Sequence, residues 1–185
     1  MKPSVSRGFS WLLALLLALT TALSPLSQKT ARAGLTPVAP SFGQDWTDPS
    51  LISVNHDWSA VPGYMGYLGN GLTESPGVDP QTVTAGTATT VSVLANQIDP
   101  RLLSAGGVAE FELRDPVVGL QGSGTASAPH LLISLNTSGK TSIHMLYTLR
   151  DLDGSGDNAV QPVALQYRLG NSGAFTNIPE AYVAD

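Results

Sequence analysis

The chain has 185 residues, of which 14 are acidic and 9 are basic, and it contains no cysteine. This length fits one globular domain of ordinary size behind a short targeting segment. The lack of cysteine excludes a disulfide framework, a thiolate metal site and a cysteine nucleophile.

Residues 1–33 have the organisation of a bacterial signal peptide. A basic start precedes an apolar run over residues 11–23, which is shorter than the roughly 20 apolar residues that cross a bilayer. Ala31 and Ala33 then supply the two small side chains that a signal peptidase recognises. Cleavage is expected between Ala33 and Gly34. An uncleaved N-terminal anchor is the alternative, because the polar gap before Ala33 is long.

Cleavage at this site changes the charge of the protein. Residues 1–33 hold four basic residues and no acidic one, so the exported chain has a net charge of about −9. Nucleic-acid affinity comes largely from lysine and arginine, so direct nucleic-acid binding is disfavoured. We expect a secreted, periplasmic or cell-surface protein with no transmembrane span after cleavage.

The exported chain has two textures. Residues 34–80 are rich in Pro, Gly, Asp and aromatic residues without clear periodicity, which predicts an irregular lead-in that packs on the following domain. Residues 81–185 contain alternating apolar and polar positions separated by turn-forming sequences. These features predict a signal peptide, a lead-in and one β-domain.

Three segments alternate with period two and predict half-buried strands: residues 131–135, 143–149 and 163–169. A weaker pattern covers residues 107–113, and residues 92–103 are the best candidate for a short helix. The expected fold is therefore all-β, an antiparallel β-sandwich of jelly-roll type.

A hairpin is expected between residues 163–169 and 174–178, because a Gly-Asn-Ser-Gly turn separates them. A fresh apolar pattern starts in residues 179–185 and is cut off. This pattern predicts a sandwich that is truncated at its C-terminal end.

An acidic loop near the C-terminal end offers the one metal-like pattern. Oxygen ligands stand at alternate positions in Asp151, Asp153, Ser155 and Asp157, with glycines between them, as in calcium loops. No glutamate occupies the twelfth position of the loop, where Pro162 stands. The two interpretations are a calcium site and an acidic turn between strands.

Four aromatic side chains in the lead-in suggest a ligand surface. Trp46, Trp58, Tyr64 and Tyr67 offer a stacking platform for a sugar ring of a glycan or cell-surface polymer. The competing account is that these rings complete the core of the domain.

No catalytic constellation is evident in the sequence. Glu110 and Glu112 point to one face of a predicted strand and loosely resemble the acid pair of a glycosidase. A solvated outer face of a strand has the same pattern. His56, His130 and His144 share no ligand-like spacing.

The stretches 54–64, 77–82 and especially 150–168, which reads Arg-Asp-Leu-Asp-Gly-Ser-Gly-Asp-Asn-Ala-Val-Gln-Pro-Val-Ala-Leu-Gln-Tyr-Arg, resemble an N-terminal module of large bacterial secreted proteins. The resemblance covers nearly all of residues 50–185. Some of those proteins look like extracellular nucleases of the endonuclease/exonuclease/phosphatase superfamily with lamin-tail or cadherin-like modules. The resemblance implies an architecture and no catalytic residue in this chain.

The sequence thus predicts a non-catalytic secreted module with an extracellular binding, spacing or presentation role and no cofactor except, on one interpretation of the acidic loop, calcium. The alternatives are the accessory domain of a secreted hydrolase, in particular a nuclease, and a carbohydrate-binding module that depends on the aromatic cluster.

Overall fold

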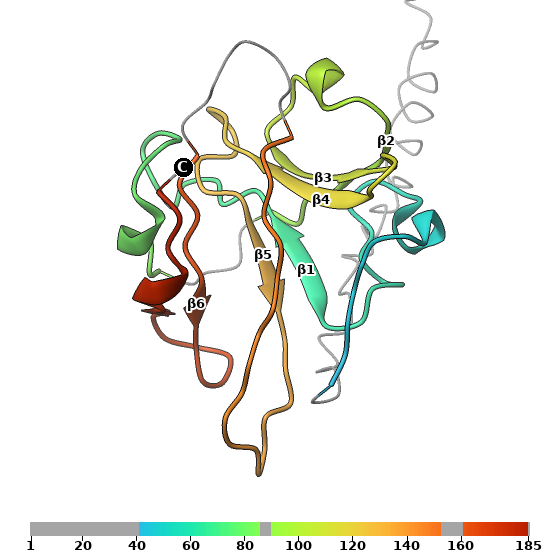
Figure 1. Ribbon diagram of the computed structural model, residues 1–185. Coiled ribbons are helices and arrows are strands. Elements are labelled where there is room, and N and C mark those ends of the chain that lie inside the picture. The colour runs from blue at the N-terminus through green and yellow to red at the C-terminus, as the bar shows by residue number, and fades with distance from the viewer. Residues whose placement is uncertain (1–40, 86–89, 153–160, 185) are drawn as a thin grey trace, which may run out of the picture. The chain divides into compact units, whose positions relative to one another are not determined.

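The computed structural model describes residues 41–85, 90–152 and 161–184 (Figure 1). In these residues the structure is all-β, as expected. The strands are β1 (Tyr64–Tyr67), β2 (Leu94–Gln97), β3 (Gly107–Phe111), β4 (Val117–Gln121), β5 (His130–Ile133), β6 (Gln166–Tyr167) and β7 (Thr176–Asn177).

Helical structure in the described residues is limited to short 3-10 turns: η1 (Pro49–Ile52), η2 (Pro80–Thr82), η3 (Pro100–Leu102) and η4 (Pro179–Ala181). None of the described helices has the length and hydropathy needed to cross a membrane.

Three of these turns begin with the dipeptide Asp-Pro. Asp48, Asp79 and Asp99 each accept a hydrogen bond from the backbone N–H two residues ahead, at 2.9–3.0 Å. The following proline suits the first helical position, because its fixed φ fits a helix and its missing N–H has no helical partner to lose. Local sequence alone therefore explains where η1, η2 and η3 begin.

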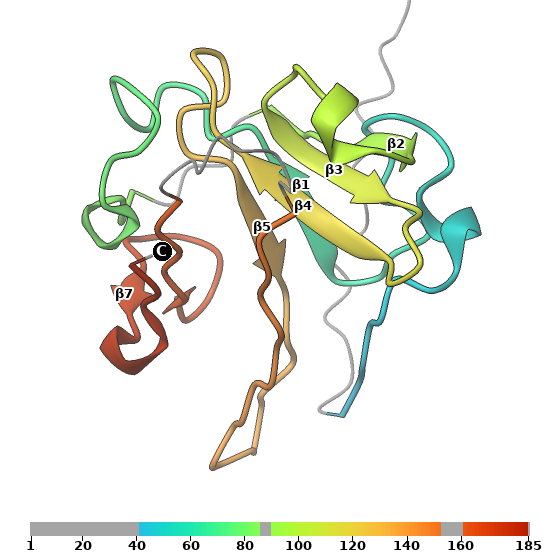
Figure 2. The same cartoon turned by 45° about the horizontal axis from the view of Figure 1, so that its top comes forward.

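The strands form three small sheets, which Figures 1 and 2 show from two directions. β1 pairs with β5, β3 lies between β2 and β4, and β6 pairs with β7. All these pairs are antiparallel except β2 and β3, which run parallel with an irregularity between Leu94 and Gln97. The expectation of a purely antiparallel arrangement is therefore wrong for this pair.

The core is built largely from the segment predicted to be an irregular lead-in. Its fully buried members are Ile52, Trp58, Val61, Tyr64, Met65, Tyr67, Val93, Ala95 and Val108. Six of these nine residues precede residue 81, and β1 supplies a strand whose four residues are all buried. The lead-in thus contributes a strand and much of the core instead of only covering them.

A turn in the lead-in is hydrogen-bonded to the segment that contains β2, through one backbone group and two side chains. The backbone N–H of His56 donates to Val93 O at 2.8 Å, and Val93 N–H donates back to His56 Nδ1 at 3.3 Å. Ala95 N–H donates to Asn55 Oδ1 at 2.9 Å. These bonds satisfy backbone groups that a neighbouring strand would otherwise pair.

Several strand predictions are confirmed. β5 covers residues 130–133 and overlaps the predicted strand 131–135 at residues 131–133. β3 lies in the segment 107–113, and the predicted hairpin near the C-terminal end contains β6 and β7. The short helix expected in residues 92–103 is wrong for its first part, which forms β2, and only η3 is helical.

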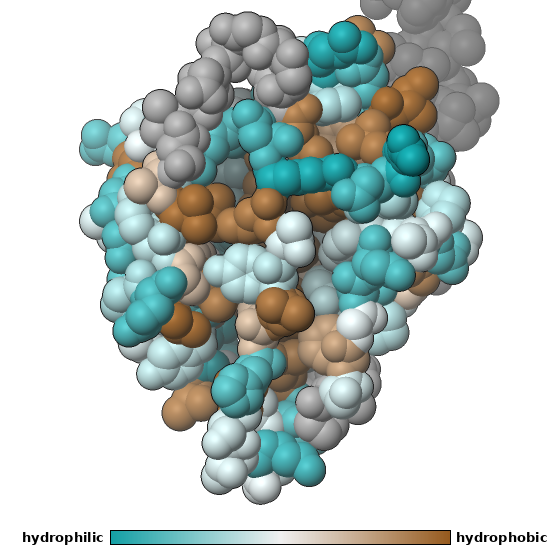
Figure 3. Space-filling model, viewed as in Figure 1, coloured by the Kyte–Doolittle hydropathy of each residue, from teal (hydrophilic) through white to brown (hydrophobic). Residues whose placement is uncertain are grey.

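The strand predicted over residues 143–149 is not formed. This segment runs alongside β5 in both ribbon views (Figures 1 and 2), but within the described residues its backbone has no hydrogen-bonded partner. Its side chains are exposed. The exposed fraction is 39–56% for the apolar side chains of Ile143, Met145, Tyr147 and Leu149. Figure 3 shows apolar side chains on the face along which the segment runs. We call residues 141–150 the open segment.

Candidate functional site

Trp46 lies in the exposed loop before η1 and takes an unusual backbone conformation. Its φ angle is 61°, in the left-handed region that residues other than glycine rarely adopt. Its ring contacts Trp58 and Tyr64 edge to face, with centroids 6.4 and 5.4 Å apart. These contacts fix the indole against the core while part of it stays exposed.

The other three rings of the predicted sugar platform are buried. Trp58 is 1% exposed, Tyr64 9% and Tyr67 5%. A sugar ring needs an accessible aromatic face, so these three side chains cannot form the platform that the sequence suggested. The competing account, in which the rings complete the core, describes Trp58, Tyr64 and Tyr67. Trp46 alone is left to face a ligand.

Glu110 is the buried carboxyl of this region. It lies on β3, on the same face as the core residue Val108, and is only 3% exposed. Its Oε2 accepts a hydrogen bond of 2.8 Å from Asn96 N–H, whereas its Oε1 has no hydrogen-bond partner among the residues that the structure describes. The interpretation of this position as part of a solvated outer face is therefore wrong, because the sheet turns it inward.

Three influences act on the protonation of Glu110. Burial raises the pKa of its carboxyl, the bond from Asn96 N–H opposes that rise, and the charge of Glu112 adds to it. Asn96 itself has a φ of 57°. Asparagine adopts this left-handed conformation more readily than most residues, and it presents the Asn96 N–H to Oε2.

Glu110 and Trp46 line one small pocket of about 190 Å³. The full lining is Trp46, Thr47, Pro49, Glu110, Glu112, Leu113 and Pro116. We call this the Trp46–Glu110 pocket. Sites for whole small molecules usually measure about 300–1,000 Å³, so this pocket accommodates one functional group of a larger ligand.

The lining of the pocket combines an aromatic ring with hydrogen-bonding groups. It offers an indole, a hydroxyl from Thr47 and two carboxyl groups, and none of its residues is a histidine, lysine or arginine. Both carboxyl groups come from β3 or the residues directly after it, whereas glycosidase carboxyls usually face each other across a cleft. The arrangement can accept hydrogen bonds from a ligand and contact its apolar part.

The acidic loop can be placed only in part. Asp151 is exposed, while Asp153, Ser155 and Asp157 lie outside the described residues, as do Ala33 and Gly34 of the predicted cleavage site. Among the residues that the structure describes, no group of three His, Asp or Glu side chains could hold a metal ion.

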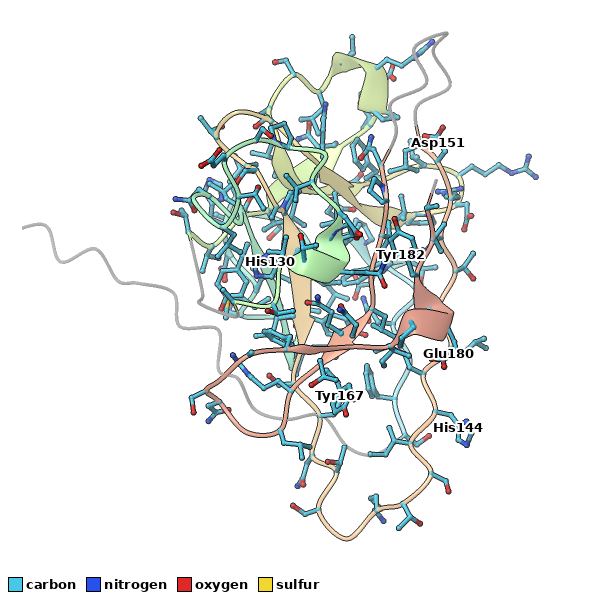
Figure 4. All side chains as sticks on the ribbon, turned by 90° about the vertical axis from the view of Figure 1, so that its left-hand side faces the viewer. His130, His144, Asp151, Tyr167, Glu180 and Tyr182 are labelled. Carbon is cyan, nitrogen blue, oxygen red and sulfur yellow. The ribbon has the colours of Figure 1, made fainter. Side chains whose placement is uncertain are left out.

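The histidines do not converge. Figure 4 shows His130 and His144 well apart, with Asp151 at a third place. His130 stacks on Tyr67 with centroids 5.2 Å apart, its Nδ1 lies 3.0 Å from Ala128 O, and burial lowers its pKa. A neutral, packed ring is the result.

Sequence reasoning missed the burial of Glu110 and the contribution of Asn96. A signal was present, because Val108, Ala109 and Phe111 place apolar side chains on both faces of the strand around Glu110. Apolar residues in successive positions indicate a strand that is buried on both faces. Nothing in the sequence indicated the positive φ angle of Trp46.

Comparisons with known protein families, with curated proteins and with solved structures found no match for this chain. The resemblance to a module of large secreted proteins therefore stays an expectation. The site has to be interpreted from its own geometry.

Proposed function

We propose that this chain is a non-catalytic, exported module that binds part of an extracellular ligand in the Trp46–Glu110 pocket. The observation that carries the proposal is the buried Oε1 of Glu110, which lacks a hydrogen-bond partner in the described part of the chain and belongs to a residue that lines a pocket with Trp46. An unsatisfied buried carboxylate oxygen costs stability, and a ligand that donates to it recovers that cost.

The extracellular part of the proposal is supported by the first 33 residues and by the charge they leave behind. Their basic start, apolar run and Ala-x-Ala end are typical of export signals. An exported chain of net charge about −9 also suits a partner that is not a nucleic acid. Secretion, the periplasm and the cell surface all satisfy this expectation.

The lack of catalysis is supported by the chemistry of the lining. Hydrolysis needs a nucleophile or activated water opposite a proton donor, held in register on the reacting bond. Glu110 could serve as an acid, but Glu112, directly after the same strand, is exposed, and the lining residues include no histidine, cysteine or lysine to act as its partner. Binding requires only complementary contacts, which the indole, the hydroxyl and the two carboxyl groups of the lining can make.

A carbohydrate ligand is the second candidate. One partly exposed indole beside two carboxyl groups can stack on a sugar and accept bonds from its hydroxyl groups. The candidate rests on Trp46 alone, because the other three aromatic rings lie in the core.

The test is to probe a glycan array and an array of charged and neutral peptides with the purified protein and with the Trp46→Ala variant. We expect a ligand class that is retained by the wild type, lost by the variant and recovered chemically unchanged. Turnover of the ligand would refute the non-catalytic role. Equal binding by both proteins would exclude the pocket as the site.

A further inference from the structure

We infer that the Trp46–Glu110 pocket takes a positively charged group, namely a primary ammonium or guanidinium at the end of a narrow aliphatic chain. The inference rests on the proposed binding function and names its ligand class. It follows from the charge, the size and the aromatic wall of the pocket.

The charge of the lining is the first argument. Glu110 and Glu112 both line the pocket, and no basic residue does. Ammonium and guanidinium groups carry only donors, so they match carboxylate oxygens without leaving an unpaired acceptor of their own. A sugar hydroxyl brings an acceptor together with its donor and gains less from a site that offers carboxylates.

The unpaired oxygen is the second argument. Within residues 41–85, 90–152 and 161–184, Oε1 of Glu110 has no hydrogen-bond partner, although Oε2 accepts a bond from Asn96 N–H at 2.8 Å. The carboxyl is thereby fixed in orientation before a ligand arrives, with one oxygen left to receive a donor. A charge-assisted bond at this position is stronger than a neutral one, because the surroundings exclude water.

The size and the wall of the pocket are the third argument. A volume of about 190 Å³ admits the head of a side chain and excludes larger rings with their substituents. The indole of Trp46 forms one wall, and a cation within about 6 Å of an indole centroid is attracted to its face. The Trp46 ring is held against Trp58 and Tyr64 and keeps part of its surface exposed, so a cation in the pocket can contact it.

The experiment is isothermal calorimetry on the whole purified protein with two probes of equal length. n-Butylammonium chloride carries the cation, and 1-butanol is its neutral counterpart. We expect saturable binding of n-butylammonium above a sodium chloride reference and none of 1-butanol at the same concentration. N-acetyl-lysine amide and cadaverine extend the series, and the tighter of these two identifies a polypeptide side chain or a free amine as the natural source.

Two variants locate the binding. Glu110→Gln keeps the size of the side chain and removes its charge, and it should weaken n-butylammonium binding roughly tenfold or more. Glu74→Gln is the matched control, because Glu74 is exposed and does not line the pocket, and it should leave the affinity within about twofold. Circular dichroism and thermal unfolding establish that both variants are folded.

Three outcomes would overturn the inference: no binding of n-butylammonium, equal binding of 1-butanol, or unchanged binding by Glu110→Gln. If the cations fail while a neutral glycan binds the wild type and not Trp46→Ala, the proposed binding function stands and only the ligand class is wrong. If neither probe binds and neither array yields a ligand that depends on Trp46, both proposals fail.

Discussion

The side chain of Glu110 is buried, and one of its two carboxyl oxygens has no hydrogen-bond partner among the described residues. Burial raises the pKa of this group in the folded protein above the ordinary value of 4.5. The folded state therefore binds a proton more tightly than the unfolded state does. The contribution of Glu110 to stability is fully present below about pH 4.5 and is lost as the pH rises through the folded pKa.

Glu110→Gln should consequently be more stable than the wild type at pH 7. The amide keeps an acceptor for Asn96 N–H and carries no charge, so it avoids the cost of burying a carboxylate. The gain should shrink as the pH is lowered and vanish near pH 4, where Glu110 is protonated in both states. Urea unfolding of both proteins across this range checks the prediction. A gain that does not depend on pH would contradict it, and Glu74→Gln supplies the control for lost surface charge.

Gly66 on β1 has no room for a side chain. A Cβ atom there would lie 2.6 Å from Ser92 O, 2.6 Å from Trp58 Cζ2 and 2.9 Å from Val108 Cγ2. Trp58 cannot move away easily, because its Nε1 donates to Ser92 O at 3.2 Å and the ring is buried. Gly66 thus permits the close approach of β1, the Trp58 ring and β3.

Gly66→Ala should therefore destabilise the protein by about 1–3 kcal/mol, the usual cost of overpacking a core. Gly124→Ala is the matched control, because no atom lies within 4 Å of the position that a Cβ would occupy there. Chemical denaturation of both variants gives the comparison. Equal stability of the two would show that the contact around Gly66 relaxes without cost.

Within the described chain, the open segment has unpaired backbone groups and exposed apolar side chains. Its backbone N–H and C=O groups lack partners among the described residues, and Leu146 is fully exposed at 100%. Unpaired strand-like segments with apolar side chains promote association. We expect the purified protein to self-associate through this segment as its concentration rises.

Leu146→Lys should reduce that association, because a charged side chain on an unpaired edge opposes the approach of another strand. Its stability should stay within about 0.5 kcal/mol of the wild type, since the replaced side chain makes no buried contact. Leu102→Lys is the control, as Leu102 is 78% exposed on η3. Sedimentation velocity measures the effect, and association that both variants leave unchanged would exclude the open segment as its cause.

Among the secondary-structure elements, segments of alternating apolar and polar residues formed strands where a neighbouring strand paired with them. Residues 131–133 of the pattern 131–135 belong to β5, because β1 pairs with them. The pattern of residues 143–149 is at least as regular, but within the described residues nothing pairs with it, so no strand forms. The alternating pattern indicates that a segment can form a strand, but it does not indicate whether another strand is available to pair with it. For the same reason the sandwich of jelly-roll type stays a prediction beyond the all-β class.

The candidate site was less predictable than the fold. Trp46 and Glu110 both attracted attention in the sequence, yet in separate hypotheses, and only the folded chain brings them to one pocket. Their proximity depends on how η1 and its preceding loop pack against β3, which is a tertiary property. Sequence patterns cannot specify such a contact between residues 64 positions apart.

For the molecule as a whole, the proposed export predicts which part of the chain forms the mature protein. The chain recovered outside the cytoplasm should begin at Gly34, because Ala31 and Ala33 match the specificity of signal peptidase. Intact-mass spectrometry of the exported protein checks this. Retention of Met1 would mean that residues 1–33 act as an anchor or are not a signal at all.

The most direct measurement is fluorine NMR of the protein labelled with 5-fluorotryptophan during titration with n-butylammonium chloride. A protein that begins at Gly34 contains two tryptophans, Trp46 and Trp58. Trp46 lines the pocket, whereas Trp58 is 1% exposed and serves as an internal reference. We predict a saturable shift of the Trp46 resonance and a much smaller shift of the Trp58 resonance. In Glu110→Gln, neither resonance should shift when n-butylammonium is added. Resonances that stay still, or that drift together without saturation in wild type and variant alike, would contradict a binding role for the Trp46–Glu110 pocket.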